Sequence, residues 1–123
     1  MSRPTVAIIG ASKDRSKYGN KSVRAHASQG YEVFPVHPSE TEIEGFKVYR
    51  CVADIPVPLD RVSLYLPPHL GVKALDAIAA KGTKELFVNP GAESDELVSR
   101  AQALGLEPIL ACSIVAAGGM PPD

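Results

Sequence analysis

The sequence predicts an α/β fold with a doubly wound, mainly parallel sheet of about five strands and helices on both faces. Two observations support this fold class. Strand-like apolar runs alternate with helical patterns along the whole chain, and the connections between them are short. The first run, Val6–Ile9, is apolar at every position, which is typical of a strand buried on both faces. Because right-handed crossovers join parallel strands, we expect helices to cover both faces of the sheet.

The first unit is a strand, a glycine turn and a helix. The run Val6–Ile9 stops at Gly10, and the charged stretch Lys13–Lys17 predicts a loop. A helix is expected over about Tyr18–Gln29, with Gly30 as its left-handed C-cap. A glycine turn between a buried strand and a helix directs unpaired backbone N–H groups at a ligand. The usual ligand at such a turn is a phosphate.

The second unit begins with an aromatic and β-branched segment, Tyr31–Val36, which predicts a strand. Pro35 lacks a backbone N–H and therefore fits the end of a strand better than its centre. After a polar loop, Phe46–Tyr49 predicts a short edge strand. Cys51–Pro58 contains prolines and predicts a turn or a single helical turn.

The second half of the chain repeats the strand–helix pattern. Each helix has apolar residues at three- and four-residue steps and a glycine after its last turn. Ser94 is a good N-cap for the second of these helices. The expected elements are a strand at Arg61–Leu66 ending at Pro67 and Pro68, a helix around Leu70–Ala79 closed by Gly82, a strand at Glu85–Val88, a helix from Ser94 closed by Gly105, and a strand at Pro108–Ala111.

Length and composition narrow the class of protein. The chain has 123 residues, 45% of them hydrophobic and 22% charged, and its formal net charge is −1. We expect one domain over residues 1–123, with a loose tail at about 118–123. This balance predicts no general affinity for nucleic acid or for a membrane. The chain contains no apolar run of membrane-spanning length, and no leader-like segment is seen before the first strand, so the expected location is cytoplasmic.

The glycine turn does not fit a nicotinamide dinucleotide. The G-x-G-x-x-G fingerprint would need glycine where Ser12 and Arg15 stand, and an acid at the end of the second strand, where Val36, His37 and Pro38 stand. Instead, Ser12 supplies a hydroxyl that can donate to a phosphate oxygen. The stretch from Lys13 to Arg24 holds five basic residues against one acid, Asp14: Lys13, Arg15, Lys17, Lys21 and Arg24. An NAD(P)-binding oxidoreductase therefore remains only as an alternative.

Four segments in order resemble a known family: VAIIGAS, QGYEVFPVHP, RVSLYLPP and ELFVNPG. They are similar to the small stand-alone coenzyme A-binding proteins, whose Rossmann-like fold is similar to the amino-terminal CoA-binding domain of succinyl-CoA synthetase alpha subunits. The resemblance extends from about Thr5 to Gly118. It implies that coenzyme A or an acyl-CoA binds at the carboxyl ends of the strands.

The resemblance also implies roles for individual residues. It assigns the CoA phosphates to Gly10, Ala11, Ser12 and Lys17, the adenosine to Val36, His37 and Pro38, and the pantetheine arm to Leu66, Pro67, Pro68, Asn89, Pro90 and Gly91. The chain departs from the family at four places. His37 stands where asparagine is common, Ser39 where a basic residue often follows, and Asn89 where glutamine is frequent. The segment Leu66–Pro67 also differs from the family pattern. These departures suggest a subgroup with altered or weaker ligand binding.

The sequence predicts a binding module without catalytic or metal-ligating residues. The three histidines are isolated, and no cluster has metal-ligand spacing. Cys51 and Cys112 are expected to be reduced, and a mixed disulfide between Cys112 and CoA is one hypothesis. The expected role is a sensor, carrier or partner subunit; a regulatory interaction module without a ligand is a further alternative. Exposed strand edges with Phe46 and Tyr49 allow a homodimer.

Overall fold

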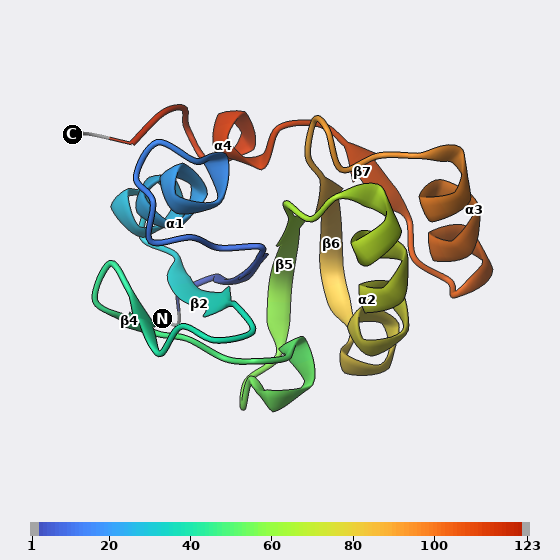
Figure 1. The fold of residues 1–123 in the computed structure, drawn as a ribbon, viewed down its shortest axis with the longest axis horizontal. Coiled ribbons are helices and arrows are strands. Elements are labelled where there is room, and N and C mark those ends of the chain that lie inside the picture. The colour runs from blue at the N-terminus through green and yellow to red at the C-terminus, as the bar shows by residue number, and fades with distance from the viewer. Residues whose placement is uncertain (1–2, 122–123) are drawn as a thin grey trace.

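Parallel strand pairing organises the fold (Figure 1), which a computed structural model describes over residues 3–121. The strands are β1 (Thr5–Ile9), β2 (Glu32–Val36), β3 (Glu42–Ile43), β4 (Phe46–Lys47), β5 (Leu59–Leu64), β6 (Thr83–Val88) and β7 (Pro108–Leu110). The helices are α1 (Tyr18–Ser28), the 3-10 turn η1 (Val52–Asp54), α2 (Pro68–Lys81), α3 (Asp95–Ala103) and α4 (Ser113–Ala116).

The main sheet has five strands in the order β2-β1-β5-β6-β7, and every pairing within it is parallel. The chain moves outward from β1 to β2 and then returns to place β5 on the other side of β1. Strand order therefore reverses between β1 and β5, which is where ligands bind in open α/β sheets. The predicted doubly wound α/β fold is confirmed.

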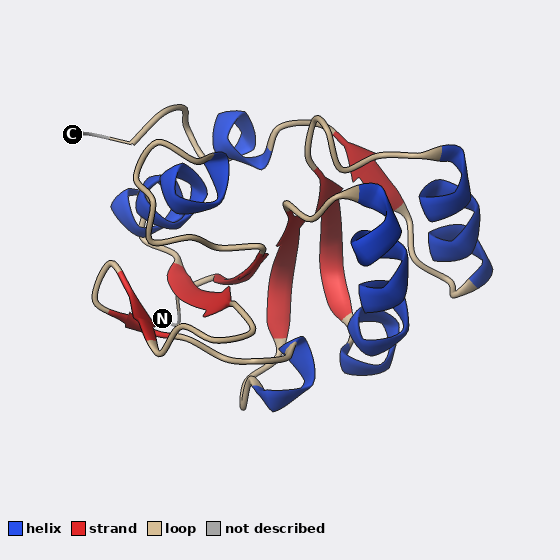
Figure 2. Ribbon diagram, viewed as in Figure 1, coloured by secondary structure: helices blue, strands red, loops and turns tan. Residues whose placement is uncertain are grey.

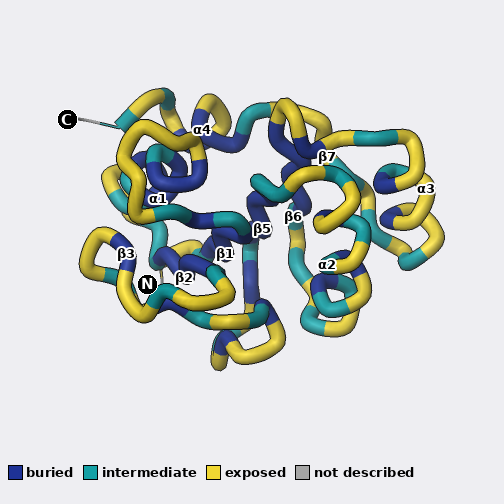
Figure 3. The backbone as a smooth tube through the Cα atoms, in the orientation of Figure 1, coloured by how far each residue is buried: buried dark blue, intermediate teal, exposed yellow. Residues whose placement is uncertain are grey.

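Helices cover both faces of the sheet, as Figure 2 shows. One apolar core lies between the sheet and α2, α3 and η1, and includes Leu64, Leu75 and Leu97. The other lies on the face that α1 covers, and includes Ile8 and Val23. Figure 3 shows β1, β2 and β5 as mostly buried, and β6 is buried toward its carboxyl end. No helix among residues 3–121 is long and apolar enough to cross a membrane.

Pro35 lies inside β2 and not at its end, contrary to the expectation. Its carbonyl accepts a hydrogen bond from the Tyr49 N–H at 2.9 Å, on the side of β2 that faces away from β1. The N–H and C=O of one strand residue point to the same side, so the proline removes no bond to β1. The proline is tolerated because the N–H that it lacks would point away from β1, on the outer side of this edge strand.

Several other boundaries differ from the prediction: β6 begins at Thr83 and not at Glu85, and β4 ends at Lys47 and not at Tyr49. The strand expected at Arg61–Leu66 is Leu59–Leu64, so Tyr65 and Leu66 belong to the turn that follows it. The next helix begins at Pro68, because proline fits the first helical turn, where an N–H has no partner in any case. The two-residue strand β3 and the four-residue helix α4 were not predicted, because such short segments carry no measurable periodicity.

Helix α1 lies unusually close to the glycine turn after β1. Gly10 has a φ of 92°, in the left-handed region, and a Cβ there would lie 3.0 Å from the Tyr65 carbonyl group. A Cβ on Gly19, in the first turn of α1, would collide with the backbone oxygen of Gly10. In the dinucleotide fingerprint, the third glycine permits close packing of the helix against the strand, and Arg15 occupies its position here. Gly19 has this role instead, because α1 begins only at Tyr18.

A buried histidine supports the opposite end of α1. His26 Nδ1 lies 2.8 Å from the Ser22 carbonyl oxygen, which can only accept, so Nδ1 carries the proton. Arg61 Nη1 lies 3.3 Å from Nε2, which is then the acceptor. Arg61 is itself buried, paired with Glu85 at 3.0 Å. Burial, opposed by the bond to Ser22 and assisted by the Arg61 charge, lowers the pKa of His26 to about 4.

We predict that the protein loses stability as the pH falls from about 6.5 to about 4. In this window the unfolded chain binds a proton at His26 that the native state excludes, since its pKa drops from 6.5 to about 4 on folding. The free energy of unfolding should fall by on the order of 3 kcal/mol across the window and be fully restored above it. Urea denaturation at several pH values measures this slope. His26→Gln should flatten it, whereas the exposed-site control His69→Gln should not; an unchanged slope in His26→Gln contradicts the prediction.

We predict that Gly19→Ala destabilises the protein by about 2 kcal/mol or more, although alanine is the better helix former by about 1 kcal/mol. The new methyl group meets backbone at Gly10, which cannot move without displacing β1. Gly71→Ala in α2 is the matched control, because its methyl group meets only the flexible ends of Leu97 and Leu64. Thermal unfolding of both variants is the measurement, and equal effects would show that the contact at Gly10 is not the cause.

Candidate functional site

A large cavity lies at the carboxyl ends of β1, β2 and β5, where the strand order reverses. Its volume is about 620 Å³. A second cavity of about 380 Å³ continues from it toward the end of β6. The two share four lining residues: Gly10, Lys17, Tyr65 and Leu66. Together they form one continuous depression across the edge of the sheet, which we call the groove.

The groove brings together nearly all of the residues that the sequence nominated. Gly10, Ala11, Ser12, Lys17, Val36, His37, Pro38 and Leu66 line the larger cavity. Pro67 and Gly91 line the smaller one. The groove thus reaches from the end of β2, through the glycine turn, to the loop after β6. Asn89 is the exception and lines neither cavity.

The loop after the glycine turn is held in place by its own side chains. Ser12 Oγ accepts a hydrogen bond from the Asp14 N–H at 3.0 Å, which leaves the hydroxyl proton free to donate to a ligand. The Asp14 carboxylate accepts from the Ser16 hydroxyl and from the Ser16 N–H at 2.9 Å. These bonds lower the pKa of Asp14. The side chains of this loop thus bond to its own backbone next to the glycine turn.

The first turn of α1 presents positive charge without an internal partner. Its N-cap residue, Lys17, has an extended backbone and makes no side-chain cap, and the turn contains no acidic residue. Asn20 and Lys21 donate their N–H groups back to the Lys17 carbonyl, at 3.1 Å in each case. The macrodipole and uncapped N–H groups at this end favour an anion in front of Gly10.

The five basic residues of this region do not act alike. Lys13 pairs with Glu40 at 3.7 Å, and Arg15 pairs with Glu44 at 3.4 Å. Lys17 is the member of the group that lines the groove. The basic cluster seen in the sequence therefore contributes one cation to the site, and two of its other four charges are balanced by acids on the surface.

Two further cations line the larger cavity and were missed in the sequence: Arg50 and Lys73. Among residues 3–121, no carboxylate lies within 4.0 Å of Lys17, Arg50 or Lys73. No aspartate or glutamate in this part of the chain lines either cavity. A groove with basic side chains and no acidic ones suits a polyanionic ligand.

His37 takes over the local role of the asparagine that it replaces. Its Nδ1 accepts hydrogen bonds from the backbone N–H groups of Ser39 at 3.1 Å and Glu40 at 3.0 Å. An asparagine side chain closes turns in the same way, by accepting from N–H groups two and three residues on. With Nδ1 accepting, the proton of the neutral ring is on Nε2, which remains a donor for a ligand.

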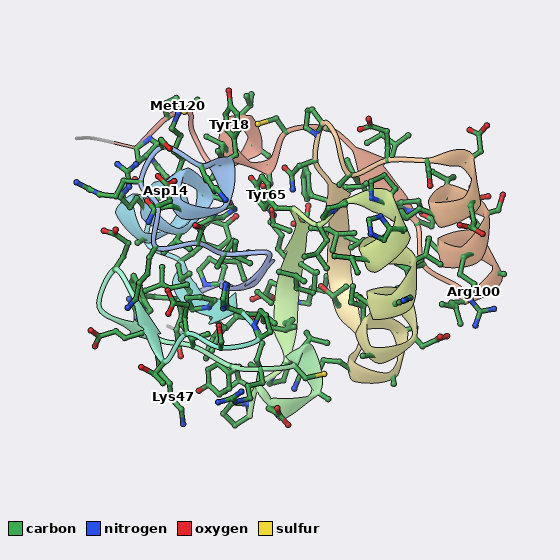
Figure 4. All side chains as sticks on the ribbon, viewed as in Figure 1. Asp14, Tyr18, Lys47, Tyr65, Arg100 and Met120 are labelled. Carbon is green, nitrogen blue, oxygen red and sulfur yellow. The ribbon has the colours of Figure 1, made fainter. Side chains whose placement is uncertain are left out.

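Tyr65 lines both cavities and is held in place by a hydrogen bond at its hydroxyl group. Its hydroxyl lies 3.0 Å from Ser113 Oγ, and Figure 4 shows the residue at the end of β5, near α1 and α4. Burial, opposed by the bond to Ser113, raises the pKa of Tyr65, so the phenol stays protonated at neutral pH. The sequence offered no signal for this residue, because it was placed inside a strand.

Asn89 is a buried structural residue. Its Nδ2 donates to Ser63 Oγ at 3.0 Å and to the Leu64 carbonyl at 2.9 Å, and its Oδ1 accepts from the Ser113 N–H at 2.8 Å. Only 1% of its surface is exposed. The sequence placed Asn89 in the ligand site, but its side chain joins β5, β6 and α4 beneath the groove. The sequence alone does not indicate whether a polar side chain at a strand end points into the protein or toward a ligand.

Both cysteines are free, as expected, and Cys112 lies between the end of β7 and the start of α4. Cys112 precedes α4 and lines neither cavity, whereas Cys51 lines the larger one. Cys51 lies at the end that Val36 and Pro38 form, away from the loop after β6. The hypothesis of a mixed disulfide at Cys112 therefore gains no geometric support.

Sequence comparison relates residues 4–118 to the family of CoA binding domains. The alpha subunit of the ADP-forming acetate–CoA ligase II of Pyrococcus furiosus is 33% identical over 86 residues, covering 68% of this chain and 18% of the ligase subunit. The ADP-forming acetate–CoA ligase I of Archaeoglobus fulgidus is 30% identical over 112 residues, covering 83% of this chain and 16% of the ligase. The chain thus spans less than a fifth of these curated relatives.

Solved structures show the same fold in both small and large proteins. A conserved hypothetical protein from Pyrococcus furiosus superposes with a TM-score of 0.83 at 36% identity, covering 94% of this chain and 99% of that one. The dinucleotide-forming acetyl-coenzyme A synthetase 1 of Candidatus Korarchaeum cryptofilum, solved with phosphate and ADP, superposes with a TM-score of 0.77 at 31% identity, covering 87% of this chain and 25% of that one. The resemblance found in the sequence is confirmed, and the chain belongs to the family of CoA binding domains.

Proposed function

We propose that this protein binds coenzyme A or an acyl-CoA along the groove, as a non-catalytic binding, sensor or partner module. The observation that carries the proposal is the continuity of the two cavities across the Gly10 turn. Coenzyme A is a long molecule with a nucleotide at one end, a pyrophosphate within it and a thin pantetheine arm at the other end. A groove that passes a phosphate turn midway suits that order of parts.

The side chains support each part of this ligand. Lys17, Ser12 and the first turn of α1 surround the turn where the pyrophosphate would lie. Val36 and Pro38 offer apolar surface for an adenine ring at one end. At the other end, Pro67, Pro90 and Gly91 line the smaller, mostly apolar cavity, which suits the arm.

One feature supports binding without catalysis. Among residues 3–121, no hydrogen bond or ion pair joins two of the titratable side chains that line the groove, whereas catalytic acids, bases and nucleophiles are usually paired in that way.

We predict that coenzyme A raises the unfolding temperature of the protein. At about one hundred times its Kd, a ligand stabilises by roughly 2.7 kcal/mol, which corresponds to about 8–15 °C for a domain of this size. Coenzyme A, acetyl-CoA, NAD and NADP should be compared by thermal unfolding, with affinities from calorimetry. A shift with NAD and none with coenzyme A contradicts the proposal.

The site residues sharpen this test. Lys17→Ala should weaken coenzyme A binding by about ten- to a hundredfold, because it removes a charged hydrogen bond to phosphate, and Ser12→Ala by less than about tenfold. Lys21→Ala is the matched control, since Lys21 lies one helical turn further on, 4.9 Å from the centre of the Tyr18 ring, and lines neither cavity. Equal losses in Lys17→Ala and Lys21→Ala would point to general electrostatic attraction and away from a defined site.

We predict that Asn89→Ala lowers stability more than it lowers affinity. The change leaves the buried Ser113 N–H without its acceptor and removes two donated bonds, which costs about 2–3 kcal/mol in the free energy of unfolding. Urea denaturation measures this loss, and calorimetry at a temperature where the variant is folded measures binding. A large loss of affinity in a variant of unchanged stability would instead return Asn89 to the ligand site.

A further inference from the structure

Arg50 reaches the groove through a strand pairing that the sequence order does not reveal. Val36 and Tyr49 form a parallel bridge. The His37 N–H donates to the Tyr49 carbonyl at 3.0 Å, and the Tyr49 N–H donates to the Pro35 carbonyl at 2.9 Å. The segment that ends at Tyr49 therefore runs beside β2 and ends at the same edge of the sheet. Arg50 follows it directly and lines the larger cavity next to His37 and Pro38.

The guanidinium group of Arg50 makes one hydrogen bond to the backbone and keeps further donors for a ligand. Its Nη1 donates to the Pro38 carbonyl at 2.8 Å. A guanidinium has five N–H donors, so four remain, and no carboxylate among residues 3–121 lies within salt-bridge distance. Arginine in such a position can bind a phosphate through two parallel hydrogen bonds.

This end of the groove is where a nucleotide ribose lies in related α/β sheets. An acid at the end of the second strand accepts hydrogen bonds from free ribose hydroxyls, whereas an arginine there accommodates a ribose phosphate. The acid is missing here, because Val36, His37 and Pro38 occupy its place. The nearest acid along the chain, Glu40, lies 3.7 Å from Lys13, which offsets its charge.

We infer that Arg50 binds a phosphate group on the ribose of the nucleotide and that the site thereby selects ribose-phosphorylated adenine nucleotides over unphosphorylated ones. This inference rests on the proposed function, in which the group is the 3′-phosphate of coenzyme A. The 2′-phosphate of NADP has the same chemistry. Ser39, which follows this strand end, carries no charge, and Arg50 supplies positive charge there from a separate segment.

The test compares affinities for ligands that differ only in the ribose phosphate. Calorimetry at fixed ionic strength measures coenzyme A against 3′-dephospho-coenzyme A, and NADP against NAD. The wild-type protein should bind coenzyme A at least about tenfold more tightly than its dephospho form. Arg50→Gln should bring this ratio close to one by weakening coenzyme A alone, and Arg50→Lys should restore part of it, because lysine keeps the charge without the planar fork.

Two matched variants separate Arg50 from the other cations of the groove. Lys73→Gln removes the second cation that lines the larger cavity and should leave the ratio unchanged. Lys17→Ala should weaken both forms of coenzyme A equally, because its partner is the pyrophosphate common to them. Since Arg50 is exposed, the unfolding temperature of Arg50→Gln without ligand should match that of the wild type.

The outcomes distinguish this inference from the proposed function. Tight binding of coenzyme A with a wild-type ratio near one, a ratio retained in Arg50→Gln, or a ratio lost in Lys73→Gln overturns the role of Arg50 and leaves CoA binding in place. Binding of NADP but not of coenzyme A, with the preference over NAD lost in Arg50→Gln, overturns the proposed function and supports Arg50. Absence of binding by all four nucleotides overturns both.

Discussion

The close contact between the Gly10 turn and the first turn of α1 is the constraint on which the site depends. Two residues without a Cβ meet there: Gly10 in a left-handed conformation and Gly19 against its carbonyl oxygen. The contact brings the uncapped N-terminus of an eleven-residue helix to the edge of the sheet. Because the strand order reverses beside this turn, the same contact also borders the groove at the carboxyl ends of β1 and β5.

Charge is distributed so that the groove remains basic in a chain of net charge −1. The acids near the phosphate turn are engaged elsewhere: Glu40 and Glu44 pair with basic residues of the loop, and Asp14 accepts from Ser16. The cations that line the groove come from three separate segments, the loop before α1, the segment after β4, and α2. A local excess of positive charge therefore needs no basic composition overall.

A buried polar cluster supports the floor of the groove. Ser63, Asn89 and Ser113 share hydrogen bonds, and the cluster reaches the groove through the Tyr65 hydroxyl. Every buried side-chain polar atom among residues 3–121 has a hydrogen-bond partner. Fully satisfied polar networks fix one arrangement of the elements that they join, here β5, β6 and α4. The helix α4, too short to be stable alone, is held by this cluster and by packing on α1.

Local chemistry was enough to predict the order of the longer strands and helices, the glycine turn and the turns after β2, β5 and β6 that border the groove. Apolar runs, helical periodicity and terminal glycines are properties of neighbouring residues, and parallel topology then places every strand's carboxyl end at one edge. Only the tertiary structure decided which polar side chains face that edge. Arg50 arrives through pairing with β2, Lys73 lies on the side of α2 that borders the cavity, and Asn89 turns inward. These outcomes depend on contacts between segments far apart in the chain, and side-chain direction at a strand end has no period from which it could be predicted.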